Sequence, residues 1–197
     1  MFDTVLIAGL GLMGGSMAKT IKARTLSRVL GWNRTRATAE QALADGSIDA
    51  IATEALYKEA DLVIIGLYPQ ATVDWLLENM PKMKKGCVIV DMVGVKQFMV
   101  DHLEQAALDA GVHYVGGHPM AGREFSGLDY ALPTLFDGAS MIFVPTRSSS
   151  ERILSQLEAY FMSLGFGQTV RCTAEQHDHM IAFTSQLAHV VSSAYIK

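Results

Sequence analysis

The chain has 197 residues, half of them apolar and 18% charged, with a formal net charge of −4 at pH 7. This length accommodates one α/β domain of ordinary size with a short additional element. The negative balance, without a cluster of Lys and Arg, argues against nucleic acid as a partner, because a phosphate backbone needs a concentrated basic face.

Targeting and metal signals are missing from the sequence. The apolar run at residues 5–12 is interrupted by glycines and lacks the basic region that precedes the apolar core of a secretory signal. No run reaches the roughly 18 apolar residues of a membrane span. Cys87 and Cys172 are far apart and lack the spacing of a zinc site or a disulfide framework. We therefore expect a cytoplasmic protein with no metal and no membrane segment.

Short apolar runs alternate with longer helix-compatible stretches, in the order typical of βαβ units. The predicted strands cover residues 4–8, 28–32, 62–66, 88–91, 113–116, 140–144 and 168–172. The predicted helices cover residues 12–24, 35–45, 71–80, 96–110 and 150–164. Several strands are apolar almost throughout, as parallel strands covered on both faces are. The pattern predicts an α/β fold of Rossmann type, with a doubly wound, mostly parallel sheet.

One more helix is predicted from Thr173, where Thr-Ala-Glu-Gln is typical of a helix start with an acidic residue in the first turn. Its apolar residues lie all around the helix, which predicts burial on more than one face. We therefore divide the chain into a nucleotide-binding domain at residues 1–172 and the beginning of a C-terminal helical domain at residues 173–197. The remainder of that helical domain is expected to be missing or supplied by another chain.

A glycine loop joins the first predicted strand to the first predicted helix, which is the context that a G-x-G-x-x-G motif needs for dinucleotide binding. The first glycine permits the tight turn, the second lets the backbone approach the pyrophosphate, and the third lets helix and strand pack closely. The helix N-terminus then attracts the phosphates. The predicted cofactor-binding residues of the loop are Gly9, Leu10, Gly11, Leu12, Met13 and Gly14.

The position that selects between NAD and NADP follows the second predicted strand. An acidic residue there binds the ribose 2′-hydroxyl of NAD, whereas this chain has Asn33, Arg34 and Thr35. Neutral and cationic donors also admit a 2′-phosphate, although Arg34 can instead stack on the adenine, so we expect NAD or NADP. The cofactor site is also predicted to include residues that follow or end two later strands: Leu67, Tyr68, Pro69 and Asp91.

A second motif, Gly-Gly-His-Pro-Met-Ala-Gly at residues 116–122, places His118 after the predicted strand at 113–116. Ligands bind at this end of the strands in open α/β sheets. Together with residues 9–16 and 184–189, the segment at 117–127 resembles the prephenate and arogenate dehydrogenases of tyrosine biosynthesis. The likeness covers essentially the whole chain, and this segment is its most specific part.

The resemblance implies an NAD(P)-dependent oxidative decarboxylation, of prephenate to 4-hydroxyphenylpyruvate or of arogenate to tyrosine. Hydride passes from C4 of the ring to the nicotinamide, and the carboxylate leaves as CO2. His118 takes the proton of the C4 hydroxyl, a task that a pKa near neutrality suits. The resemblance also implies a homodimer formed through the helical domain.

Seven further residues are predicted to bind the substrate: Gly94, Arg123, Glu124, His177, Thr184, Ser185 and His189. Arg123 is among them although it departs from the family pattern in the loop after His118. His177 and His189 are twelve residues apart and so share one stripe of a helix. We expect His189 to face the substrate and His177 to support the site through a hydrogen bond, the alternative for His177 being an exposed position at a helix start. The arginine at 123 can meet a carboxylate.

Gly94 departs from the family pattern, which has a serine at this position between the aspartate at 91 and the lysine at 96. That serine is expected to hydrogen-bond the substrate hydroxyl, an interaction worth about 0.5 to 1.5 kcal/mol. Two other interpretations stay open. One is a relative of the β-hydroxyacid dehydrogenases or imine reductases, whose catalytic lysine helix is not evident here. The other is a catalytically silent NAD(P)-binding module.

Overall fold

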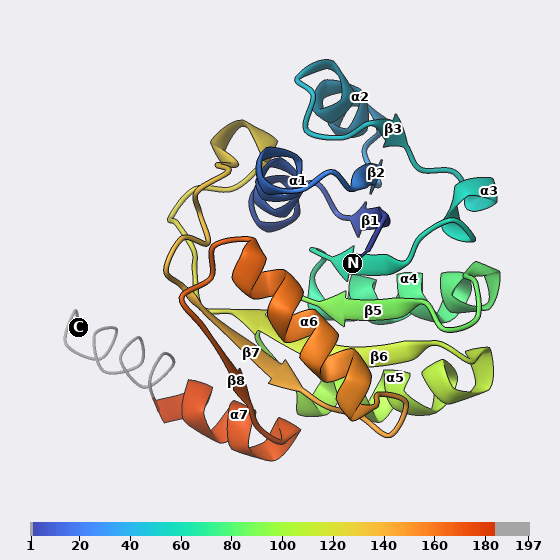
Figure 1. Cartoon of the computed structure of the whole chain (residues 1–197), viewed down its shortest axis with the longest axis vertical. Helices are drawn as coiled ribbons and strands as arrows, with labels where there is room; N and C mark the ends of the chain where they lie inside the picture. Colours follow the sequence, from blue (N-terminus) through green and yellow to red (C-terminus); the bar gives the residue numbers. More distant parts are fainter. Residues whose placement is uncertain (1, 184–197) are drawn as a thin grey trace, which may run out of the picture.

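The computed structural model describes residues 2–183, which form one eight-stranded sheet with helices on both faces (Figure 1). The strand order is β3-β2-β1-β4-β5-β6-β7-β8. The strands are β1 (Thr4–Ala8), β2 (Arg28–Trp32), β3 (Ala50–Ile51), β4 (Leu62–Ile65), β5 (Val88–Asp91), β6 (His113–Pro119), β7 (Ser140–Val144) and β8 (Gln168–Arg171). All neighbouring strands are parallel except β6 and β7, so the predicted Rossmann-type, mostly parallel sheet is confirmed.

The helices alternate with the strands along the chain. They are α1 (Leu12–Arg24), α2 (Arg36–Ala44), α3 (Glu54–Tyr57), α4 (Pro69–Asn79), α5 (Gln97–Ala110), α6 (Glu151–Ser163) and α7 (Ala174–Ile181), with short 3-10 helices η1 (Met80–Lys82) and η2 (Leu128–Tyr130). Each predicted helix up to residue 164 is present within two residues at either end. None of the helices in residues 2–183 is long and apolar enough to cross a membrane.

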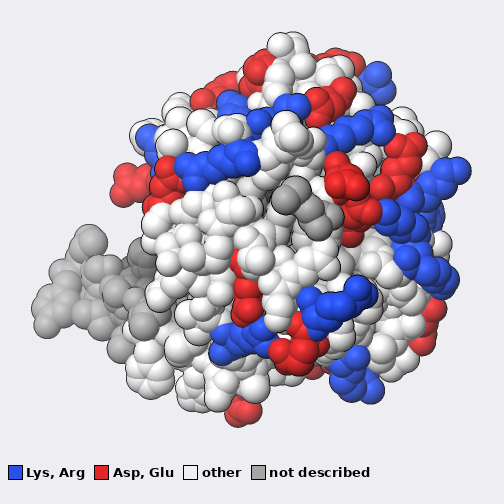
Figure 2. Space-filling view, in the orientation of Figure 1, with Lys and Arg blue, Asp and Glu red and all other residues white. Residues whose placement is uncertain are grey.

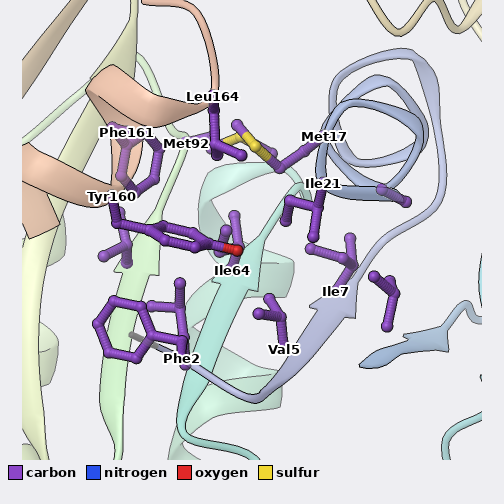
Figure 3. Close-up of a cluster of buried hydrophobic side chains, with 14 of the residues drawn as sticks. Phe2, Val5, Ile7, Met17, Ile21, Ile64, Met92, Tyr160, Phe161 and Leu164 are labelled. Carbon is purple, nitrogen blue, oxygen red and sulfur yellow. The ribbon is translucent and has the colours of Figure 1, made fainter. Parts of the chain in front are cut away.

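Two hydrophobic cores, one on each face of the sheet, follow from the alternation of side chains along the strands. Val5 and Ile7 of β1 pack on one face against α1, α2 and α6, whereas Leu6 and Ala8 pack on the other against α3, α4 and α5. Figure 3 shows the first core, where Tyr160 and Phe161 of α6 and Met17 and Ile21 of α1 lie over the same face of the sheet. Burial on both faces explains why these strands read as continuous apolar runs.

The strand β6 is longer than the sequence predicts, and the expectation that it ends at Gly116 is wrong. Gly116 to Pro119 continue the strand and pair antiparallel with β7. Gly116 and Gly117 allow close packing at this point. A Cβ on Gly117 would lie 2.3 Å from the carbonyl oxygen of Asp91. Pairing with β5 involves only residues 113–115, so Pro119 has a strand on one side only and its missing N–H is tolerated. His118 therefore lies within a strand rather than after one.

Helix α7 begins as the sequence predicts. The Thr173 side chain accepts a hydrogen bond from the backbone N–H of Gln176, and the Gln176 side chain returns one to the backbone N–H of Thr173. This reciprocal capping box fixes the helix start. The expected continuation of the helix falls outside the described residues.

Charged side chains are interspersed over the surface. On the face shown in Figure 2, many Lys and Arg side chains lie beside Asp and Glu. Ion pairs of this kind include Lys22 with Asp49 and Arg24 with Asp137, both at 2.6 Å.

Candidate functional site

The glycine loop between β1 and α1 is shaped by close backbone contacts. Gly9 has a φ of +94°, and a Cβ there would lie 2.7 Å from the carbonyl oxygen of Gly66 at the end of β4. A Cβ on Gly14 would lie 1.8 Å from the carbonyl oxygen of Gly9. Larger residues at either position would push α1 away from the strands, so these two glycines are sterically required.

The N-terminus of α1 is open toward one side. Gly11 is the N-cap residue, no side chain caps the helix, and its first turn contains no acidic residue. A Cβ on Gly11 would meet no atom within 4 Å. The first backbone N–H groups of a helix need acceptors, and a phosphate supplies both the acceptor oxygens and the negative charge that the helix dipole favours.

Two grooves flank this helix end and share Gly11, Gly66, Leu67 and Tyr68. The first groove, of about 440 Å³, runs over residues 32–35 at the end of β2 and along α4. The second, of about 310 Å³, is also lined by Leu12, Met13, Met92 and residues 125–127. A dinucleotide has two nucleosides on either side of a pyrophosphate, and two grooves on either side of a bare helix N-terminus fit that shape.

Asn33 holds the glycine loop in place. Its Oδ1 accepts a hydrogen bond from the backbone N–H of Leu10 at 3.0 Å, and its Nδ2 donates to the carbonyl oxygen of Thr35 at 3.1 Å. Arg34 is exposed at the rim of the first groove beside it. No acidic residue lies at the end of β2, so a cationic side chain borders the place where the ribose 2′ position is expected.

Leu67 and Tyr68, between β4 and α4, line both grooves, whereas Pro69 lines neither. Tyr68 is 86% exposed, and Pro69 is the first residue of α4, where its missing N–H is no loss.

Asp91, in contrast, lies in the interior and lines neither groove. Its carboxylate is ion-paired with the fully buried Lys96 and accepts hydrogen bonds from the Tyr114 hydroxyl at 2.7 Å and the Val93 N–H at 2.8 Å. Burial lowers the pKa of Lys96, although Asp91 beside it opposes this. The structure therefore places Asp91 in a buried polar network that holds the loop between β5 and α5.

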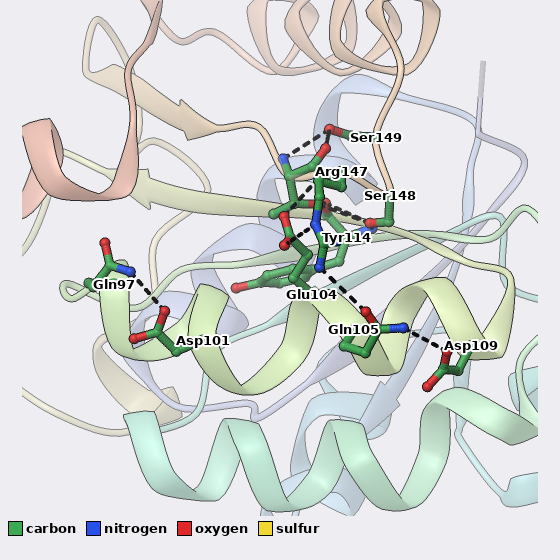
Figure 4. A network of polar contacts seen from close by, with 10 residues as sticks. Gln97, Asp101, Glu104, Gln105, Asp109, Tyr114, Arg147, Ser148 and Ser149 are labelled. Carbon is green, nitrogen blue, oxygen red and sulfur yellow. Dashed lines mark hydrogen bonds and ion pairs between the residues drawn. The ribbon is translucent and has the colours of Figure 1, made fainter.

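The backbone of Tyr114 is fixed from the other side of the same network. Its N–H donates to the Ser148 side chain at 2.9 Å, and its carbonyl oxygen accepts from Thr146 at 2.5 Å. Figure 4 shows Arg147 in the same loop, with its guanidinium against Glu104 of α5. The loop at residues 146–148 thus connects the beginning of β6, the strand that carries His118, to α5.

His118 is partly buried and contacts residues from two other elements. Its Nδ1 lies 2.8 Å from Nε2 of His177 on α7. On its other side, a Cβ built on Gly94 would lie 3.7 Å from both Cε1 and Nε2 of His118. Burial, and then the neighbouring His177 and Lys96, lower the pKa of His118 to about 4. The ring is therefore neutral at pH 7 and can accept a proton. Its pKa is lower than the near-neutral value expected from the sequence, because the ring is buried and faces His177 and Lys96, so His118 is a weaker base than expected.

His177 is buried and not exposed at the helix start. Its Nδ1 lies 2.7 Å from Oδ1 of Asp178, which also accepts the backbone N–H of Lys96 at 2.8 Å. Burial lowers the pKa of His177. Asp178 and Lys96 are absent from the residues expected from sequence, and the only signal for Asp178 was its position next to His177.

Two of the other expected substrate residues, Arg123 and Glu124, have no hydrogen bond to this histidine cluster among the described contacts. Arg123 and Glu124 are exposed on the loop after β6, and the Arg123 guanidinium lies 5.4 Å from the centre of the Phe125 ring. Neither residue lines the grooves described above. Thr184, Ser185 and His189 lie outside the described residues. Within residues 2–183, no group of three His, Cys, Asp or Glu side chains is arranged to hold a metal ion.

Comparison with known proteins identifies the family. The family model described as "Prephenate dehydrogenase, nucleotide-binding domain" matches residues 17–168. The chain is 33% identical to the prephenate dehydrogenase of Bacillus subtilis, over all of this chain and 53% of that protein. It is 30% identical to the cyclohexadienyl dehydrogenase of Zymomonas mobilis, over 97% of this chain and 65% of that protein. It therefore spans between about half and two thirds of the length of these relatives.

A solved structure has a similar fold over the whole of this chain. The prephenate dehydrogenase of A. aeolicus, in complex with hydroxyphenyl propionate and NAD+, superposes with a TM-score of 0.89 at 26% identity. The match covers 100% of this chain and 68% of that one. Because the family model covers most of the chain and the fold agrees, this chain belongs to the prephenate dehydrogenase family and carries its nucleotide-binding domain.

Proposed function

We propose that this chain provides the cofactor site and the catalytic base for NAD(P)-dependent oxidative decarboxylation of prephenate or arogenate. The observation that carries the proposal is the position of His118 beside the loop after β5. Met92 of this loop lines the second groove, and Gly94, two residues later, faces His118. Residues 92–94 therefore connect the second groove, which fits one half of a dinucleotide, to the proton acceptor His118.

The assignment of roles follows from the chemistry of each group. The bound cofactor supplies a hydride acceptor. His118 accepts the proton of the C4 hydroxyl at Nε2, because its Nδ1 is occupied by His177. Loss of the side carboxylate as CO2 makes the ring aromatic, so the step is effectively irreversible. The partly buried position of His118 limits water around the transferred proton.

Both nicotinamide cofactors are included in the proposal. The A. aeolicus relative binds NAD+, which supports NAD. The absence of an acidic residue at the end of β2 and the presence of Arg34 at the groove rim support NADP, because a guanidinium suits a phosphate and a carboxylate would repel it. Titration of the chain with each cofactor, followed by calorimetry, measures the preference directly.

We also propose that residues 173–197 begin a helical domain through which the protein forms a homodimer. The capping box at Thr173 and the contact of α7 with the start of α5 support a helical segment that leaves the sheet at this point. Measurement of the molar mass in solution tests the dimer.

The experiment that tests the reaction supplies prephenate and arogenate, each with NAD+ and NADP+, and follows the absorbance of reduced nicotinamide. His118→Asn is expected to abolish turnover and to leave cofactor affinity nearly unchanged, because the histidine lies outside both grooves. His102→Asn, an exposed position on α5, is the matched control and is expected to keep full activity.

Three results would overturn the proposal. Cofactor binding without turnover of either substrate supports the silent nucleotide-binding module instead. Turnover of β-hydroxyacids or imines in place of prephenate and arogenate supports the alternative dehydrogenase or reductase. An equal loss of cofactor affinity and turnover in His118→Asn means that its role is misassigned.

A further inference from the structure

Asp178 is the acceptor for three N–H groups from two elements. Its Oδ1 accepts from the backbone of Lys96 at 2.8 Å and lies 2.7 Å from Nδ1 of His177, and its Oδ2 accepts from the backbone of Gln97 at 2.9 Å. Burial opposes ionisation, but the hydrogen bonds from Gln97, His177 and Lys96 together lower the pKa of Asp178. The side chain is therefore a carboxylate at neutral pH, and a carboxylate only accepts hydrogen bonds.

The Asp178 carboxylate determines which ring nitrogens of His177 and His118 carry protons. Because Asp178 cannot donate, Nδ1 of His177 must carry a proton. A neutral His177 then has a lone pair on Nε2, which lies 2.8 Å from Nδ1 of His118. His118 must donate from Nδ1, and its Nε2 is left with the lone pair, on the side of Gly94. With both rings neutral, no other arrangement of protons makes both hydrogen bonds.

We infer that Asp178, acting through His177, is a positioning residue that fixes the Nδ1–H tautomer of His118 and leaves Nε2 free to accept a proton. An aspartate that orients an imidazole in this way is known to matter greatly when the imidazole is a general base. The consequence for catalysis rests on the proposed function. The tautomer itself does not, because it follows from hydrogen bonds present in the chain alone.

The same carboxylate also fixes the loop that faces His118. Helix α5 begins at Gln97 with no cap from the side chain of its own N-cap residue, Lys96, and Asp178 supplies the missing acceptors from α7. The ion pair between Asp91 and Lys96 joins the two ends of this loop. Asp178 of α7 thus holds both the histidine pair and the backbone at the start of α5.

Asp178→Leu tests the inference, because it removes both acceptor oxygens and keeps a side chain of similar size. Nδ1 of His177 then has no acceptor, its proton is no longer held there, and His118 is free to take the Nε2–H tautomer. Long-range nitrogen–proton NMR spectra of the imidazole rings report the tautomer without substrate or cofactor. We expect the Nδ1–H form of His118 in the native chain and a shift toward Nε2–H in Asp178→Leu. Glu175→Gln, an exposed change in the first turn of the same helix, is the matched control and should leave the spectrum unchanged.

A second pair of variants covers the case in which Asp178→Leu weakens the fold. His177→Gln keeps an oxygen that can accept from Nδ1 of His118, whereas His177→Phe fills the buried site without an acceptor. We expect His177→Gln to retain the Nδ1–H tautomer and His177→Phe to lose it. In turnover assays we expect kcat to fall at least about tenfold in Asp178→Leu and His177→Phe, with little change in KM.

The outcomes separate this inference from the proposed function. An Nε2–H tautomer in the native chain, or an unchanged tautomer in both Asp178→Leu and His177→Phe, overturns the inference. If the tautomers shift as expected but neither prephenate nor arogenate is oxidised, the positioning role stands and the proposed reaction fails.

Discussion

Replacing Asp91 with Asn is expected to destabilise the fold by an amount that decreases as the pH rises. The side chains of Asp91 and Lys96 are both fully buried and form an ion pair. In the variant, Lys96 keeps its ammonium in the interior without this partner, or it releases its proton. Burial already lowers the pKa of Lys96, and the charge of Asp91 is the largest influence that raises it. Without Asp91, releasing the proton costs less than keeping an unpaired ammonium in the interior.

The size of the effect follows from the pKa of lysine in the unfolded chain, near 10.5. Releasing a proton costs about 1.36 kcal/mol for each pH unit below that value. The penalty is therefore at most about 5 kcal/mol at pH 7 and about 2 kcal/mol at pH 9. The upper figure agrees with the roughly 3 to 5 kcal/mol typical of breaking a buried ion pair. The direction of the pH dependence follows from proton binding. A lysine whose pKa is lowered in the folded chain binds fewer protons there than in the unfolded chain. The destabilisation therefore disappears as the pH rises toward the pKa of the unfolded chain.

Urea unfolding at pH 7, 8 and 9, followed by circular dichroism, measures the difference in free energy of unfolding between the variant and the native chain. Asp109→Asn, at an exposed position of α5, is the control and should change stability by no more than about 0.5 kcal/mol at each pH. A difference that stays constant or increases between pH 7 and pH 9 would refute the reasoning.

Three further substitutions address the cofactor loop, the site and helix α7. Gly14→Ala places a Cβ 1.8 Å from the carbonyl oxygen of Gly9, and calorimetry should show at least about a tenfold loss of NAD+ affinity; an unchanged affinity contradicts the role of the loop. Gly94→Ser places a hydroxyl beside Nε2 of His118, and kcat/KM should rise about 2- to 13-fold, equivalent to one neutral hydrogen bond; a fall would argue against an orienting role. Thr173→Ala removes the N-cap oxygen of α7, and thermal unfolding should show a loss of about 1 kcal/mol; no loss would mean that the cap does not stabilise the helix.

Each of these substitutions has a matched control. Gly122→Ala adds a Cβ that meets no atom within 4 Å and should leave NAD+ affinity unchanged. Gly94→Ala adds the carbon without the hydroxyl and should not raise kcat/KM. Thr173→Ser keeps the capping oxygen and should retain nearly all of the stability.

Features encoded within a few neighbouring residues could be predicted from the sequence alone. The apolar runs identified seven of the eight strands, since burial on both faces leaves a local signature. The glycine loop at residues 9–14 and the helix start at Thr173 could also be predicted, because the steric limits of the loop and the hydrogen bonds of the cap involve only a few neighbouring residues. The short strand β3 and helix α3 were missed, because two and four residues are too few to show a period.

The contacts that make the site were decided only by the tertiary structure. His118 and His177 are separated by 59 residues, and Asp178 caps a helix whose first residue lies 81 positions earlier. Periodicity shows that a side chain is buried, but it does not show which polar group from a distant segment will satisfy it. Asp91 illustrates the difference. Its place at a strand end indicated the cofactor, whereas the arrival of Lys96 and Tyr114 from two other elements placed it in the interior.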